Sequence, residues 1–538
     1  MKKLQYILLA LSGFLCCACE QELLETTPAD PDLTNITPDP CEGSAGSANF
    51  AKFVAIGNSF VAGVQGGALF NDGQTNSLPA IMNKQFACVG GSSTFNQPNI
   101  NSALGFNIFI SPNPTPSGAV LGRLLLQGTP PRPTPQISDN GALPNPAVNP
   151  AFLYTGSKAE LNNFGVQAIV LGQALIPQTG NWAGAGVDPR FNPFYGRLAY
   201  PGTGTSTIIG DAAAAGGTFF MFWLGLDDFF LHAAFGADAT KAPLTAPGPL
   251  PNGFDGQYAA AVGSLLASNP ELKGVVGNFP NIFAMPHFTS VTWNPVPLDA
   301  ATATVVNTSY AGYNQVLDAL KGPPFSYNAA DIDARKISFA AGNNAVVIVD
   351  ESLNDYGDEF DILEGAGAIS PAQRAALAPY EQVRQTKSTD IIPLGAGSVL
   401  GTLADPGNPL TVIGVAVPLA DQYVLIPSEI AAIESARTSF NATVKAMADA
   451  NTSRLAFADV NKAFSDFVTA KAMVSNNITL TPNINPPTGI YSEDGAHPNT
   501  RGYAFIANVF IGAINERFGS TVPLVNLSKY GATSLPLP

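Results

Sequence analysis

The sequence predicts an α/β fold, a doubly wound three-layer α/β/α sandwich around a parallel sheet with large loop insertions. Three features predict this fold: short, mostly apolar runs, amphipathic helical stretches, and long Gly- and Pro-rich segments between them. Runs that are apolar throughout, rather than alternating, indicate parallel strands covered on both faces. Strands that alternate with helices indicate helices on both faces of one sheet.

The strands and helices of this sheet follow from apolar periodicity. The expected strands are Phe53 to Ile56, Thr218 to Leu224, Leu272 to Val276 and Arg454 to Val460. The expected helices are Glu429 to Ala450 and Gly502 to Phe518, each with apolar residues on one face.

Residues 66–155, 176–210 and 285–410 do not fit this rhythm, because polar, Gly and Pro residues dominate them. We expect them to be insertions around the active face, since loops at the carboxyl ends of strands carry function in such folds. The strand-like run Ala345 to Val349 leaves a separate second domain in 285–410 as the alternative.

The first residues predict an export signal. Lys2 and Lys3 precede an apolar stretch that is too short to span a bilayer, and Cys19 follows it directly. This pattern resembles a bacterial lipoprotein cleavage site, which implies a signal peptide 1–18, a lipidated Cys19, a tether 19–50 and a domain 51–538. The acidic run 20–25 resembles the surface-export tag of Bacteroidetes lipoproteins; an ordinary secretory peptide cut elsewhere is the alternative.

Composition limits the class of protein. The chain is 46% hydrophobic and 12% charged, so it can bury a large core, and its net charge of −15 argues against nucleic acid. Besides Cys19, the mature chain would keep Cys41 and Cys88, which form a disulfide or remain unpaired thiols. No Cys/His spacing suits zinc, so we expect no metal and no cofactor.

Two motifs at opposite ends of the chain carry the chemistry. Ser59 follows the first expected strand, and Asp494 lies three residues before His497. A serine, a histidine and an aspartate are the minimum set for a serine hydrolase. The chain has three histidines, and we expect His232 and His287 to be structural, which leaves His497 as the base.

These residues resemble the SGNH (GDSL-type) hydrolase family, in its Bacteroidetes lipoprotein branch. The matching blocks, in family order, are Gly57 to Ser59, Asn163 to Ala168, Gly225 to Asp228 and Asp494 to His497. The resemblance implies a flavodoxin-like sheet and an active site at its carboxyl edge. Each block alone also fits an ordinary turn or strand end, so their joint occurrence carries the argument.

The resemblance implies a role for each member of the triad. Ser59 would attack an ester carbonyl, and His497 would remove its proton and later protonate the leaving alcohol. Asp494 would hold the imidazole in the correct tautomer.

The resemblance also implies an oxyanion hole, in which this chain departs from the family. The backbone N–H groups of Ser59 and Ala168 would hold the oxyanion, with Gly165 as the fallback donor. The family has Asn where this chain has Asp227, and an ionised carboxylate only accepts hydrogen bonds; it could donate only if protonated, which needs a strongly raised pKa. We therefore expect Asp227→Asn to preserve or raise esterase activity by restoring a donor.

The resulting hypothesis is an exported lipoprotein esterase that cleaves lipid acyl or glycan acetyl esters. Its lipid would hold it at the outer membrane of the cell envelope, where it could be surface-exposed. The alternative is a catalytically impaired binding lipoprotein of the same fold, for lipid or glycan. A structural partner of an outer-membrane complex is a third interpretation, which the sequence neither supports nor excludes.

Overall fold

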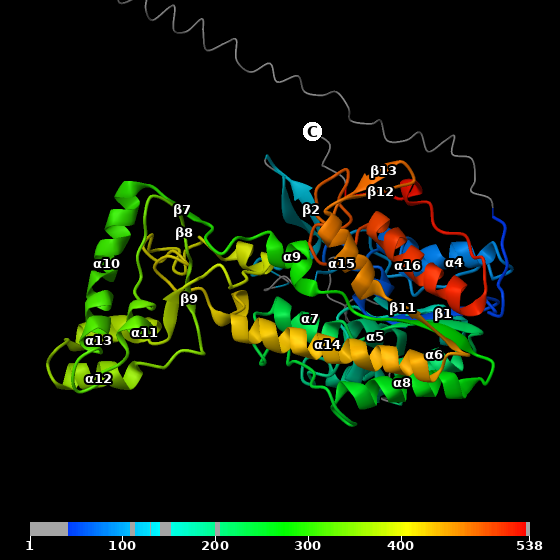
Figure 1. Ribbon diagram of the computed structural model, residues 1–538, viewed down its shortest axis with the longest axis horizontal. Helices are drawn as coiled ribbons and strands as arrows, with labels where there is room; N and C mark the ends of the chain where they lie inside the picture. The colour runs from blue at the N-terminus through cyan, green and yellow to red at the C-terminus, as the bar shows by residue number, and fades with distance from the viewer. Residues whose placement is uncertain are drawn as a thin grey trace, which may run out of the picture. The chain divides into compact units, whose positions relative to one another are not determined.

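The protein has an α/β fold built on a parallel sheet. A computed structural model describes residues 41–107, 113, 115–129, 131–139, 152–199 and 205–533. Its five-stranded sheet has the order β11-β6-β5-β1-β4, and all neighbouring strands pair in parallel (Figure 1). The strands are β1 (Phe53–Gly57), β4 (Asn163–Gly165), β5 (Phe219–Trp223), β6 (Lys273–Gly277) and β11 (Leu455–Ala458).

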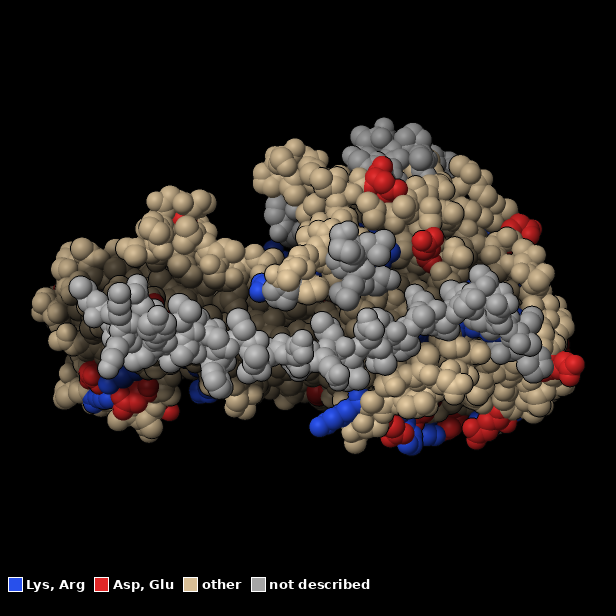
Figure 2. All heavy atoms as spheres, turned by 90° about the horizontal axis from the view of Figure 1, so that it is seen from above, with Lys and Arg blue, Asp and Glu red and all other residues tan. Residues whose placement is uncertain are grey.

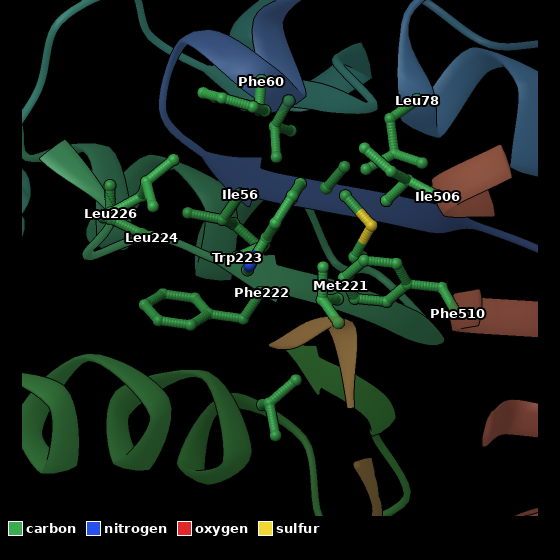
Figure 3. Packing of buried hydrophobic residues seen from close by; sticks show 14 of the residues in the cluster. Ile56, Phe60, Leu78, Met221, Phe222, Trp223, Leu224, Leu226, Ile506 and Phe510 are labelled. Carbon is green, nitrogen blue, oxygen red and sulfur yellow. The ribbon is translucent and has the colours of Figure 1, made fainter. Parts of the chain in front are cut away.

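The sheet core explains why these runs become strands. Every residue of β1 and of β5 is buried, as expected of strands covered on both faces. Figure 3 shows Trp223 and Phe222 of β5 among the aliphatic and aromatic side chains that surround Ile56 of β1. Four of the five strands lie where apolar runs predicted them, and the short β4 lies inside the block that the family resemblance matched.

Helices that pack around this sheet include both of the predicted ones, slightly longer than expected. The main helices are α4 (Leu78–Ala87), α6 (Ile208–Ala214), α7 (Asp227–Ala234), α8 (Phe254–Ser268), α14 (Pro427–Ala450), α15 (Val460–Ala470) and α16 (Thr500–Phe518). Helix α16 packs on α4, and α8 packs on α6 and α14. Asn499 begins α16 by accepting the N–H of Gly502 at 3.0 Å, which also ends the loop that carries His497.

The three insertions contain more regular structure than the sequence indicated. They carry α3 (Asn71–Thr75), α5 (Pro193–Ala199), α9 (Pro286–Thr289), and the hairpin β2 (Leu121–Gln127) with β3 (Arg132–Ile137). A further hairpin, β12 (Met473–Ser475) with β13 (Ile478–Leu480), precedes the His497 loop. Short length and neighbouring Gly and Pro residues concealed these elements, although β2 itself contains four leucines.

The third insertion forms a second hydrophobic core, which extends to Ile426 rather than ending near residue 410. Its elements are β7 (Val296–Leu298), α10 (Ala300–Ala319), α11 (Ala329–Asp333), β8 (Gly342–Asn344), β9 (Val347–Val349), α12 (Gly357–Gly365), α13 (Pro371–Leu377) and β10 (Val383–Gln385). The long helix α10 was missed because Thr, Asn and Tyr, which are weak helix formers, fill much of it.

The folded part of the chain starts before residue 51, so the expected tether is too long. Cys41 and Cys88 form a disulfide, and Phe50 stacks on Phe86 with ring centroids 4.2 Å apart. Ser47 also donates its backbone N–H to Phe518 at the end of α16. Cys19 and the rest of the expected signal and tether lie outside the described residues.

Candidate active site

Ser59 lies at the carboxyl end of β1, as the first residue of the short helix α2 (Ser59–Ala62). The chain needs a glycine just before this turn, because a Cβ on Gly57 would lie 2.6 Å from the carbonyl oxygen of Trp223. Asn58 caps the helix by accepting the N–H of Phe60 at 3.2 Å. The N–H of Ser59 has no hydrogen-bond acceptor among the described residues, as expected at the first position of a helix.

Ala168 supplies the hydrogen bond that Ser59 receives. Its backbone N–H donates to Ser59 Oγ at 3.0 Å. Its φ of +50° lies in the left-handed region, which costs a non-glycine residue about 1 kcal/mol or more. Asn192 holds the turn by donating its side-chain amide to the carbonyls of Gln167 and Ala168.

Gly165 does not offer the fallback donor. Its N–H donates to the side chain of Asn163 at 2.8 Å, and the residue pairs with Gly57 inside the sheet. A Cβ here would lie 2.4 Å from the backbone nitrogen of Ala62, so the glycine permits α2 to approach β4. Its role is close packing beneath the serine.

Asp227 lies at the start of α7 and accepts two hydrogen bonds. Its Oδ1 accepts from Asn58 Nδ2 at 2.5 Å, and its Oδ2 accepts from the N–H of Ile169 at 3.1 Å. Burial raises the pKa of Asp227 to about 7, although these two donors and the charge of His497 act in the opposite direction. Asp227 therefore acts as a hydrogen-bond acceptor that supports the turn before Ser59 and the turn at Ala168. This role differs from that of the oxyanion donor which the resemblance implied at this position.

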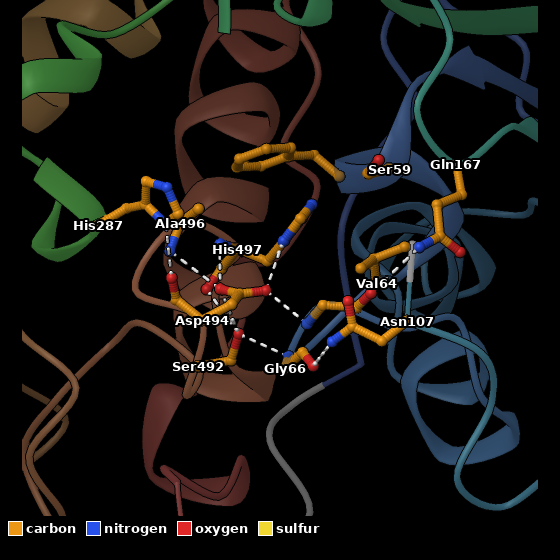
Figure 4. Close-up of polar contacts among 12 residues, drawn as sticks. Ser59, Val64, Gly66, Asn107, Gln167, His287, Ser492, Asp494, Ala496 and His497 are labelled. Atoms are coloured by element: carbon orange, nitrogen blue, oxygen red, sulfur yellow. Dashed lines mark hydrogen bonds and ion pairs between the residues drawn. The ribbon is translucent and has the colours of Figure 1, made fainter. Parts of the chain in front are cut away.

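Asp494 and His497 meet in the loop before α16. His497 Nδ1 lies 2.7 Å from Asp494 Oδ2, and the carboxylate also accepts from the backbone N–H groups of Gly67, Ala496 and His497 (Figure 4). Burial alone would raise the pKa of Asp494, but the charge of His497 and these donors outweigh it and lower the pKa to about 2. A carboxylate that accepts from Nδ1 leaves Nε2 as the basic nitrogen of the neutral imidazole.

The turn that carries Ser59 and the loop that carries His497 come together at this edge of the sheet. The ring of Phe60, the residue after Ser59, lies 5.0 Å from the imidazole of His497, centroid to centroid. Gly67, a few residues further along, donates to Asp494 at 2.6 Å. Figure 4 shows the imidazole of His497 directed toward the turn that holds Ser59. Ser59 and His497 are both buried, each residue being 1% exposed.

Several residues of the site were missed by sequence reasoning. Ser492 Oγ lies 2.9 Å from the His497 carbonyl oxygen and 3.2 Å from Asp494 Oδ1, the two acceptors of its one hydrogen, and it accepts from the N–H of Gly66 at 2.9 Å. His287, expected to be structural, contacts the Asp494 carbonyl through Nδ1 at 3.0 Å. The contact of Ser492 with Gly66 and that of His287 with Asp494 join segments that are distant in sequence, so no local pattern indicates them. Only the proximity of Ser492 to Asp494 in the chain offered a hint.

A cavity of about 280 Å³ lies on another side of the same loop. Arg123, Glu493 and Phe70 line it, whereas Ser59 and His497 do not. Arg123 stacks on Phe70 at 4.0 Å and forms an ion pair with the buried Glu493 at 3.7 Å. Because Ser59 and His497 do not line this cavity, the cavity is not the place where the acyl group of an ester would meet the serine.

Lys and Arg side chains do not gather into a continuous patch on the face in Figure 2, where tan surface separates scattered charges. Elsewhere, the carboxylates of Glu351, Asp421 and Glu429 lie within 4.8 Å of one another, a donor set that suits a hard divalent cation. Burial raises the pKa of both Asp421 and Glu429, and the nearby carboxylate of Glu351 acts in the same direction on each. No other group of this kind was found in the described part of the chain.

Comparisons with family models, with curated proteins and with solved structures found no match to this chain. None of the described helices combines the length and apolar character that crossing a membrane requires.

Proposed function

We propose that this chain is a serine esterase of the SGNH type, exported as a lipoprotein. The hydrogen bond between Asp494 and His497, beside the turn that carries Ser59, is the observation that carries the proposal. A buried carboxylate with a low pKa, held against an imidazole at the carboxyl edge of a parallel sheet, suits nucleophilic catalysis.

The reaction follows from these positions. His497 Nε2 takes the proton of Ser59 Oγ as the oxygen bonds to the ester carbonyl carbon. The resulting oxyanion lies against the N–H groups of Ser59 and Ala168. His497 then gives its proton to the leaving alcohol as the ester C–O bond breaks. Water, deprotonated by His497, then bonds to the acyl carbon, and His497 returns this proton to Ser59 Oγ as the acyl–Oγ bond breaks and the acid leaves.

The finer architecture is part of the same proposal. Numbered along the chain, the sheet strands lie in the order 2-1-3-4-5, which supports a flavodoxin-like sheet. Figure 1 draws α4 and α16 on one side of the strands and α8 and α14 on the other, which supports a three-layer sandwich. Ser59 would then lie where ligands bind in such sheets, outside the carboxyl ends of the strands.

Export and substrate are proposed from sequence. A lipid on Cys19 would hold the enzyme at the outer membrane, in reach of lipid acyl esters or acetylated glycans. No metal or other cofactor takes part in the proposed reaction. The acidic net charge disfavours nucleic acid as a partner.

A binding lipoprotein without catalysis is the second candidate. Its support is Asp227, which supplies no donor, so two backbone N–H groups alone would hold the oxyanion. Losing one donor of an oxyanion hole typically slows catalysis by about a hundredfold or more. A site of this kind would bind an ester without cleaving it.

A serine-reactive fluorophosphonate separates the two candidates. The purified chain is incubated with the probe beside Ser59→Ala, His497→Gln and the control Ser268→Ala, whose hydroxyl only donates to Leu265. Labelling of the parent and the control, but not of the other two variants, supports the esterase. An unlabelled parent that also leaves short and long p-nitrophenyl esters intact contradicts it.

A further inference from the structure

His287 makes two hydrogen bonds to consecutive carbonyl groups of the His497 loop. Its backbone N–H donates to Gly495 at 2.9 Å, and its ring Nδ1 lies 3.0 Å from the carbonyl oxygen of Asp494. A carbonyl only accepts, so Nδ1 carries the hydrogen, and His287 is the Nδ1–H tautomer. Asp494 is thereby held at its backbone by one histidine while its carboxylate holds the other (Figure 4).

The close approach is built into the loop. Gly495 has a φ of +71°, and a Cβ there would lie 2.7 Å from the backbone nitrogen of His287. A glycine is therefore needed for the loop to lie against α9 and to turn between Asp494 and His497. This explains the Asp-Gly sequence of the motif by its contact with His287.

The ring of His287 is suited to a fixed, uncharged role. Burial lowers its pKa, which keeps the imidazole neutral and the Nδ1–H donor constant. Its Nε2 is buried and has no hydrogen-bond partner among the described residues. Phe230 and Phe288 lie against the ring, with centroids 6.0 Å and 4.9 Å away. The side chain is thus packed in one orientation, aimed at Asp494.

The element that carries His287 is held from its other side as well. Helix α9 packs against the 3-10 helix Leu394–Ser398 of the second hydrophobic core. Val291, just after α9, also forms an isolated bridge with Ile392. Packing in the second core therefore supports the position of α9 against the His497 loop.

We propose that His287 is the positioning residue of the Asp494–His497 pair. By fixing the Asp494 backbone from α9, it keeps the carboxylate in the place where it can accept from His497 Nδ1. The catalytic part of this inference rests on the proposed esterase function, whereas the structural part does not.

The test compares two nearly isosteric replacements. The side-chain amide of Asn can place its nitrogen near the position of histidine Nδ1, so His287→Asn keeps the donor, whereas His287→Leu removes it. The pair His232→Asn and His232→Leu is the control, because His232 Nδ1 also lies 2.7 Å from a carbonyl, that of Ala242, away from the loop.

The first readout is the NMR resonance of the His497 Nδ1 proton, assigned by its loss in His497→Gln. We expect it in the parent, in His287→Asn and in both His232 variants, but broadened or absent in His287→Leu. The second readout is fluorophosphonate labelling, which we expect to fall about three- to tenfold in His287→Leu alone, the value of one hydrogen bond.

Each readout tests a different proposal: labelling of the parent tests the esterase, and the His497 Nδ1 proton resonance tests the positioning role. If the parent is not labelled, the esterase proposal fails, and the resonance still decides the positioning role. A parent without the resonance, or His287→Leu with an unchanged resonance, would overturn the positioning role. So would equal losses in the Asn and Leu variants, because the donor would then be irrelevant.

Discussion

Asn58 donates its side-chain amide to Asp227 at 2.5 Å, which joins the turn that carries Ser59 to the start of α7. The other carboxylate oxygen of Asp227 accepts from Ile169, the neighbour of Ala168. The buried side chain of Asp227 therefore connects Asn58, the residue before Ser59, with the turn of Ala168, whose N–H donates to Ser59. This relationship changes the expected effect of placing an Asn at position 227.

Asp227→Asn is now expected to lower activity, contrary to the expectation from sequence. Both groups that face the carboxylate are N–H donors, so an amide nitrogen would oppose one of them. Asn58 cannot simply turn over, because its oxygen accepts from Phe60. We expect the rate of fluorophosphonate labelling to fall about tenfold or more.

Asp228→Asn is the matched control for this prediction. Asp228 accepts from the N–H of Leu171 and from the hydroxyl of Thr245, and a hydroxyl can rotate to accept instead. An amide therefore fits at position 228. If Asp227→Asn is labelled at or above the parent rate, a hydrogen-bond donor at position 227 favours the reaction, and the argument for an acceptor is wrong.

Ala168→Gly should retain labelling and leave the protein as stable or slightly more stable. Glycine removes the cost of a φ of +50°, while its greater freedom in the unfolded chain offsets part of the gain. We expect the free energy of unfolding, measured with urea, to rise by no more than about 1 kcal/mol. Ala168→Val should lower it, because a β-branched residue is disfavoured in this region. A Gly variant less stable than the Val variant would refute the argument.

Stability should decrease between about pH 4 and pH 7 because burial raises the pKa of Asp227, to about 7, and also that of Asp228. The folded pKa of Asp228 is raised to about 7, above the ordinary value of about 3.9, so the folded state binds the proton more tightly. The neutral form stabilises the fold below pH 4, and this contribution is lost as the pH rises through that window. Asp494 acts in the opposite direction, below about pH 4, since its pKa is lowered to about 2.

Urea unfolding at several pH values measures this effect. Relative to the parent, Asp228→Asn should lose about 1.4 kcal/mol less per pH unit within that window. The exposed Ser268→Ala, which removes no titratable group, should follow the parent. Identical slopes for the parent and Asp228→Asn would contradict the assignment.

The disulfide between Cys41 and Cys88 should stabilise the fold by closing a long loop. The two cysteines are 47 residues apart, and loops of this length correspond to about 2–4 kcal/mol. We expect the double variant Cys41→Ser and Cys88→Ser to lose about this much in urea unfolding without losing fluorophosphonate labelling. If labelling is lost as well, the disulfide also supports the site.

Much of the sheet could be predicted from local sequence. The runs that became β1, β5, β6 and β11 are apolar throughout, and α14 and α16 have clear helical periodicity. The helix α10 and the second core could not be predicted in the same way, because their apolar residues are scattered among polar ones. The folded start at Cys41 was missed for a different reason: Phe50 is one aromatic residue in a polar stretch, and its stacking partner Phe86 lies in another element.

The sequence by itself determined the short-range features of the candidate site. Asp494 and His497 lie three residues apart, so one turn of a loop can bring them into contact, and Ser59 follows an apolar run that ends in glycine. Only the tertiary structure decided that Phe60 lies against His497, that Asn58 contacts Asp227 and that His287 holds the Asp494 backbone. The physical reason is distance along the chain: these partners belong to different elements, and only packing of the whole sheet selects which of them meet.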